Sequence, residues 1–182
     1  MNTTYIVIAI VLGLVIIAAV AWPMINGRKR TGLLHDHFGA EYDRTVETMG
    51  DVKKAQTELE GRKKHVEALD IHPLSVVERE RYLADWSAVQ SKFVDEPGQA
   101  IVDADRLIME VMHLRAYPIS DFEQRAADVS VSYPTLVSNY RAARAIALKN
   151  QEHQADTEEL RQAMIYYRSL FDELLVTDAV VV

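Results

Sequence analysis

The chain has 182 residues, of which 49% are hydrophobic and 26% charged, with only 7 glycines and 5 prolines. This composition is typical of a helical domain with a short appendage. The absence of cysteine excludes disulfides, thiolate zinc sites and a cysteine nucleophile. The formal net charge of −7 becomes −10 without residues 1–30, which carry three bases and no acid. Such an acidic chain excludes a general nucleic-acid binder, which needs a basic face.

A long apolar run occupies residues 5–25 and begins YIVIAIVLGLVIIAAVA. At a rise of about 1.5 Å per residue, roughly 20 residues cross the hydrocarbon core of a bilayer. No base precedes the run, and Arg28, Lys29 and Arg30 follow it. The positive-inside bias therefore predicts a single-pass anchor in the bacterial inner (plasma) membrane, with the N-terminus outside and the following domain in the cytoplasm. The alternative is an exported domain, released by cleavage at the small residues AVA at 19–21.

The anchor divides the chain into four expected parts. Residues 1–26 form the transmembrane anchor, 27–35 a basic and polar connector, 36–176 the soluble α-helical domain and 177–182 a flexible tail. The tail TDAVVV is apolar but short, and chain ends of this kind are commonly disordered.

The soluble part begins with a long helix, predicted over residues 36–69 from apolar residues at helical spacing. Gly50 and Gly61 are its weak points, because glycine inside a helix costs roughly 1 kcal/mol relative to alanine. A His-Pro pair then breaks the helix, and the sequence SVVE at residues 75–78 forms a capping box. The next helix is therefore expected over residues 76–94.

The second half of the domain also reads as helices. The sequence SDFE at residues 120–123 forms a capping box for a short helix over 121–128, and VSVSYP at 129–134 alternates like an extended linker. Helices follow over 134–151 and 157–174, the last one capped by Asp-Thr and rich in acids at its start. Since no segment remains for a sheet, we expect an all-α fold: one transmembrane helix and a soluble bundle of about five helices.

The helix between these segments carries the candidate chemistry. Asp95 is its predicted N-cap, and Pro97 lies in its first turn. Glu110 and His113 have the E-x-x-H spacing of di-iron sites in helical bundles, but such a site needs a second motif that the chain lacks. On a helical wheel both residues fall outside the apolar arc, beside Arg106, which favours an exposed charge ladder. We therefore expect no catalytic residue, cofactor or metal, with Glu110 and His113 as the only candidate metal ligands.

The same helix suggests a partner-binding surface. Val102, Met109 and Ala116 recur every seven residues on the side predicted to face water. An apolar stripe on a polar side is typical of a second packing layer or a partner groove. We predict that a protein partner binds there.

Several phrases resemble an uncharacterised family of small bacterial membrane-anchored proteins, sometimes called secreted, with no assigned activity. The phrases are IHPLS, RYLADW, QSKFVDEPGQAIVDADRLIMEVM, YPISDFEQRAADVSVSYP, NYRAARAIA and TEELRQAMIYYRSLFDELL, and the likeness spans roughly residues 34–175. The resemblance implies a bacterial source and no particular mechanism.

These observations favour a non-enzymatic interaction or scaffold module that is anchored to the membrane through residues 5–25 and serves envelope-related assembly or signalling with a protein partner. Anchoring raises the effective concentration of other membrane-bound partners. The alternative is a membrane-tethered enzyme or metal-binding helical bundle that uses Glu110 and His113.

Overall fold

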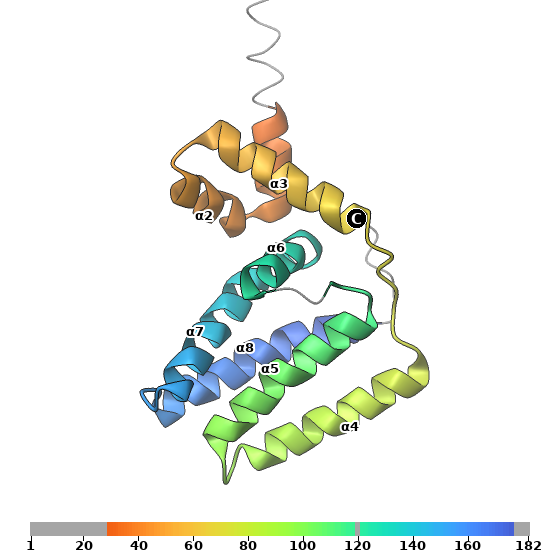
Figure 1. Cartoon of the computed structure of the whole chain (residues 1–182), viewed down its shortest axis with the longest axis vertical. Coiled ribbons are helices and arrows are strands. Elements are labelled where there is room, and N and C mark those ends of the chain that lie inside the picture. The colour runs from red at the N-terminus through yellow and green to blue at the C-terminus, as the bar shows by residue number, and fades with distance from the viewer. Residues whose placement is uncertain (1–28, 119–120, 177–182) are drawn as a thin grey trace, which may run out of the picture.

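The computed structural model describes residues 29–118 and 121–176, and every regular element in these ranges is a helix (Figure 1). A helical segment over residues 29–38 comes first. It is followed by α2 (Ala40–Met49), α3 (Val52–Glu67), α4 (Val76–Lys92), α5 (Pro97–Leu114), α6 (Phe122–Ser132), α7 (Val137–Gln151) and α8 (Thr157–Leu174). The predicted all-α class is confirmed, with eight helical segments in the described ranges instead of about five in the bundle.

None of these helices is long and apolar enough to cross a membrane. The predicted anchor at residues 1–26 and the predicted tail at 177–182 lie outside the described residues.

The predicted helix over 36–69 is wrong, because two glycines divide this part of the chain. Gly39 and Gly50 adopt φ of 51° and 64°, a region that residues with a Cβ avoid. After Gly50, Asp51 caps α3 by accepting a hydrogen bond from the Lys54 amide at 2.8 Å. Gly61, by contrast, remains inside α3. The three resulting helices fold back on one another around a small core made of Leu34, Phe38, Tyr42, Leu59, Val66 and Val131.

The larger core lies among α4, α5, α7 and α8. α5 occupies its centre and packs against the other three helices, with Ile101, Ala104, Ile108 and Val111 fully buried. The Trp86 ring of α4 stacks on the Phe171 ring of α8, with the centroids 4.4 Å apart. Since the apolar arc predicted for α5 is the face that is buried, the amphipathic pattern placed this helix correctly.

α6 contributes residues to both cores. The prediction of an extended linker over residues 129–134 is wrong for residues 129–132, which are helical. The helix continues to Ser132, with Val129 buried in the larger core and Val131 in the smaller one. α6 contacts α3 on one side and α7 on the other. Burial on two opposite sides outweighs the weak preference of β-branched residues for extended structure.

Helix starts follow the predicted chemistry in part. Ser75 and Asp156 each form the capping box that starts α4 and α8. α6 is capped by Asp121 instead of by Ser120, which lies outside the described residues. Asp95 is not the cap of α5. Glu96 takes that place without a side-chain cap bond, and Pro97, as predicted, lies in the first turn.

The buried side chain of Arg115 forms hydrogen bonds with residues at the ends of several helices. Arg115, at the C-terminus of α5, is fully buried, and its Nε donates to the His72 carbonyl at 3.2 Å. Its Nη1 donates to the Tyr133 hydroxyl at 2.8 Å and to the Leu174 carbonyl at 3.0 Å. Among the described residues no carboxylate pairs with it, and Nη2 has no hydrogen-bond partner. The Leu174 carbonyl at the negative end of α8, the His72 carbonyl and the Tyr133 hydroxyl therefore take the place of a counter-ion.

We expect Gly50→Ala to lower the free energy of unfolding by about 1 kcal/mol and Gly61→Ala to raise it by about the same amount. A Cβ at either position meets no atom within 4 Å, so the opposite signs arise from backbone conformation alone. Urea denaturation of the two variants measures both values. A stabilising Gly50→Ala would contradict the break between α2 and α3.

Arg115→Lys is expected to cost about 3 kcal/mol, because three hydrogen bonds are lost and buried acceptors are left unpaired. Arg79→Lys is the matched control. Arg79 Nε also donates to a carbonyl at the end of α8, that of Leu175 at 3.2 Å, but its side chain is exposed. Thermal unfolding compares the two variants, and equal losses of stability would contradict a larger contribution from the buried Arg115.

Candidate functional site

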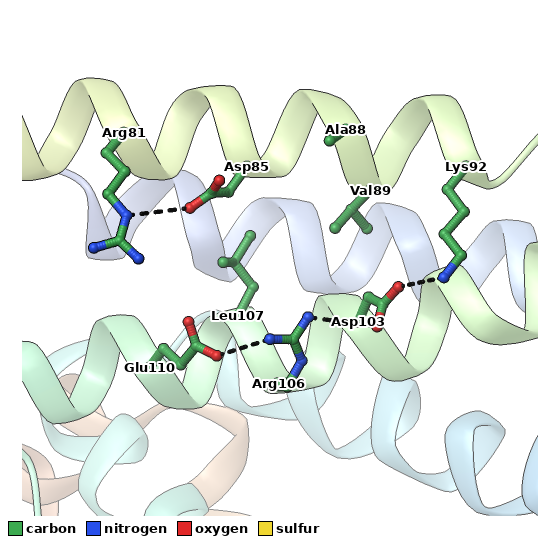
Figure 2. Close-up of a pocket in the computed structure, with 9 residues that line it drawn as sticks. All are labelled: Arg81, Asp85, Ala88, Val89, Lys92, Asp103, Arg106, Leu107 and Glu110. Carbon is green, nitrogen blue, oxygen red and sulfur yellow. Dashed lines mark hydrogen bonds and ion pairs between the residues drawn. The ribbon is translucent and has the colours of Figure 1, made fainter.

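Glu110, one of the two candidate metal ligands, lines a groove between α4 and α5 (Figure 2). The groove has a volume of about 370 Å³. Nine residues line it: Arg81, Asp85, Ala88, Val89 and Lys92 from α4, and Asp103, Arg106, Leu107 and Glu110 from α5. Their spacings of three and four residues along each helix place them on the two facing sides.

Acids and bases alternate along both walls of this groove. Arg106 contacts Glu110 at 3.1 Å and Asp103 at 3.5 Å, so the charge ladder predicted for α5 is confirmed. The Lys92 Nζ donates across the groove to Asp103 at 2.8 Å and links the two helices. On the opposite wall Arg81 faces Asp85 at 3.7 Å (Figure 2).

The electrostatics of the groove favour the ionised form of one of its acids, Asp103. The hydrogen bond from Lys92, together with the bond from Gln99 and the charge of Arg106, holds the pKa of Asp103 below its ordinary value. A carboxyl with a lowered pKa is ionised near neutral pH and is a poor general acid. The neighbouring Tyr82 has a raised pKa because it is buried and because Glu110 is close to it, so its hydroxyl stays protonated.

The other candidate metal ligand lies apart from this groove. The side chain of His113 is exposed and does not line the groove. Within residues 29–118 and 121–176, no group of three or more His, Cys, Asp or Glu side chains is placed to hold a metal ion.

The predicted partner stripe is not one continuous helix face. Val102 is 40% exposed and Met109 is half-buried on α5, but α5 ends at Leu114. Ala116 lies beyond that end with φ of 68°, where the chain turns away from the helix. The seven-residue spacing assumed that the helix continued, and the reversal after Arg115 removes Ala116 from the stripe.

Two polar residues in and directly after α5, Asp105 and Arg115, are buried but were not predicted to be buried, although their positions on the helical wheel indicate it. The same helical wheel places Arg115 within the apolar arc and Asp105 at its edge. Asp105 is buried, and it accepts hydrogen bonds from the Tyr167 hydroxyl at 3.0 Å and from Arg144 at 3.1 Å. Burial and the charge of Asp105 raise the pKa of Tyr167. Both polar residues hold neighbouring helices in place.

Another buried acid, Asp128, lies where α6 packs against α3. The Gln124 amide donates to its Oδ1 at 2.8 Å, His65 Nε2 lies 3.7 Å from the same oxygen, and Oδ2 has no hydrogen-bond partner. Burial raises the pKa of this carboxyl, while Gln124, His65 and Arg62 oppose the rise.

Comparison of the chain with protein-family models, curated proteins and solved structures gives no match.

We expect Asp128→Asn to stabilise the protein near neutral pH and to have little effect near pH 3. The pKa of Asp128 is higher in the folded state than in the unfolded state, so the protein loses stability as the pH rises above the unfolded-state pKa. Asparagine does not ionise and therefore removes this loss of stability. Asp103→Asn is the control with the opposite sign. Because folding lowers the pKa of Asp103, its carboxylate stabilises the protein at pH values above the unfolded-state pKa of about 4. This stabilisation is lost on acidification. Melting temperatures between pH 3 and 8, a range that spans the ordinary aspartate pKa of about 4, test both variants. If the melting temperatures of both variants changed with pH in the same way, the opposite pKa shifts of Asp128 and Asp103 would be contradicted.

Proposed function

We propose that this chain is a non-enzymatic helical interaction module, held at the bacterial inner membrane by residues 1–26. In this proposal its helical domain faces the cytoplasm and docks a protein segment in the groove between α4 and α5. The single observation that carries the proposal is the alternation of acids and bases on both walls of that groove.

The ion pairs of the groove can be exchanged for contacts with a partner, because two of its arginines are exposed. The side chains of Arg81 and Arg106 are 70% and 60% exposed. Exposed ion pairs contribute at most about 1 kcal/mol to stability, so exchanging them for a partner's charges costs little. Each guanidinium also offers five donors, of which the pairs within the groove use only some. A protein segment with both acidic and basic side chains fits this arrangement.

The floor of the groove offers a partner little apolar surface. Val89 and Leu107 lie between the two helices but are already buried in the larger core, and of the apolar lining residues only Ala88 is exposed. The charges along the two walls would therefore fix the register of a bound segment and supply most of its contacts.

The alternative of an enzyme or a metal-binding bundle lacks a specific supporting observation. The groove acid with a shifted pKa is shifted away from proton donation. The resemblance to bacterial membrane-anchored proteins supports the anchored location, as does the apolar run at residues 5–25.

A photo-crosslinking amino acid at Ala88, in the full chain in cells, is expected to give one specific crosslinked protein. Combining it with Arg81→Glu and Lys92→Glu should reduce that product at least tenfold, because both reversals place an acid where the partner finds a base. The same amino acid at Glu80 is the matched control, since Glu80 is exposed on α4 but does not line the groove. Equal amounts of crosslinked product at Ala88 and Glu80, or no crosslinked product at Ala88, would contradict the proposed docking in the groove.

A further inference from the structure

The outward face of α3 is a strip of small residues and lysines, bordered by Glu58 and Glu60, which pair with arginines. Thr57, Gly61 and Ala68 are exposed, as are the neighbouring Lys53, Lys54 and Lys64. The opposite face of the same helix is buried through Ala55, Leu59 and Val66. Spacings of three and four residues place the exposed set on one side of the helix, which we call the lysine strip.

The lysines of this strip have no counter-ion, unlike the other charges on α3. Glu58 pairs with Arg62 at 3.0 Å, Glu60 with Arg30 at 2.6 Å and Glu67 with Lys63 at 3.8 Å. Within the described ranges no ion pair reaches Lys53, Lys54 or Lys64. In a chain with a net charge of −7, these three unpaired lysines form a local positive surface.

A shallow cleft opens at the start of the lysine strip. Met49, Lys53, Lys54, Thr57 and Glu58 line it, and its volume is about 490 Å³. Met49 and the adjacent Val52 are exposed apolar residues, at 39% and 47%. Two lysines beside exposed apolar side chains are suited to an anionic lipid headgroup at the membrane interface.

The start of the described chain brings α3 close to the predicted anchor. Thr31 accepts a hydrogen bond from Gln56 at 2.9 Å, and Arg30 pairs with Glu60. The predicted span ends at residue 25, and the four steps to residue 29 reach at most about 14 Å. Figure 1 shows α3 at the end of the molecule where the described chain begins, and α4 at the opposite end.

We propose that the lysine strip of α3 docks on anionic lipid headgroups of the membrane that holds the anchor. This inference rests on the proposed membrane anchoring and goes beyond it, because an anchor alone leaves the domain free to rotate above the bilayer. The positive charges of Lys53, Lys54 and Lys64 select anionic over zwitterionic lipid. The rest of the domain is acidic and is repelled by the same surface, which opposes binding through any other face.

The chain contains no cysteine, so a Thr57→Cys variant of the full chain carries a single environment-sensitive dye at the centre of the strip. The labelled protein is placed in nanodiscs of phosphatidylcholine alone or mixed with phosphatidylglycerol. We expect a blue shift, and quenching by headgroup nitroxide lipid, in the mixed nanodiscs, with both reversed by high salt. A dye at Ser87→Cys, exposed on α4, should show neither change.

Replacing Lys53, Lys54 and Lys64 by glutamine should reduce the docked fraction. At roughly fivefold per lysine near an anionic surface, the equilibrium constant for docking falls by about 100-fold. The matched control replaces Lys149 on α7 and Arg161 and Arg168 on α8 by glutamine, so that its net charge changes by the same amount as in the lysine variant. This control should dock like the parent protein.

The outcomes separate the two proposals. Incorporation into nanodiscs without a change at Thr57, or an equal change in phosphatidylcholine alone, overturns lipid docking and leaves the anchor standing. Failure to incorporate at all contradicts the anchor, and with it the docking that rests on the anchor. Protection of Thr57 only when a cell extract is added would assign the strip to a protein partner and overturn the lipid assignment.

Discussion

The buried charge of Arg115 is the constraint on which the arrangement of the helices depends. Its guanidinium is satisfied by His72 before α4, Tyr133 after α6 and Leu174 at the end of α8. A buried cation cannot lose these acceptors without a large desolvation cost, so four parts of the chain must meet at one point. The reversal that follows, with Ala116 at φ of 68°, closes the end of α5 through bonds from Tyr117 to Met112 and from Ala116 to His113.

Several of the remaining charges connect helices. Buried Glu41 contacts Arg44, Arg62 and Arg141 within 3.3 Å and so connects α2, α3 and α7. Two surfaces differ from this pattern, the lysine strip of α3 and the groove between α4 and α5. They lie at opposite ends of the molecule (Figure 1). If α3 faced the bilayer, the groove would be directed away from it, towards partners in solution.

Local sequence signals placed part of the fold and of the candidate site correctly. The capping boxes at Ser75 and Asp156 and the first-turn Pro97 stand where the chain actually starts helices, because capping depends only on neighbouring residues. The pairing of Arg106 with Glu110 was also predictable, since i and i+4 side chains meet on any helix. The opposite wall of the groove was not, because nothing local shows that α4 packs beside α5.

The sequence by itself determined the helical class, the amphipathic face of α5 and the excess of acid, all of which depend on composition and periodicity. Only the tertiary structure decided that Gly50 breaks a helix and Gly61 does not, and that Val129 and Val131 continue α6. The physical reason is the same in each case. Glycine tolerates both conformations and valine accepts helix or strand, so the free energy of packing against distant residues makes the choice.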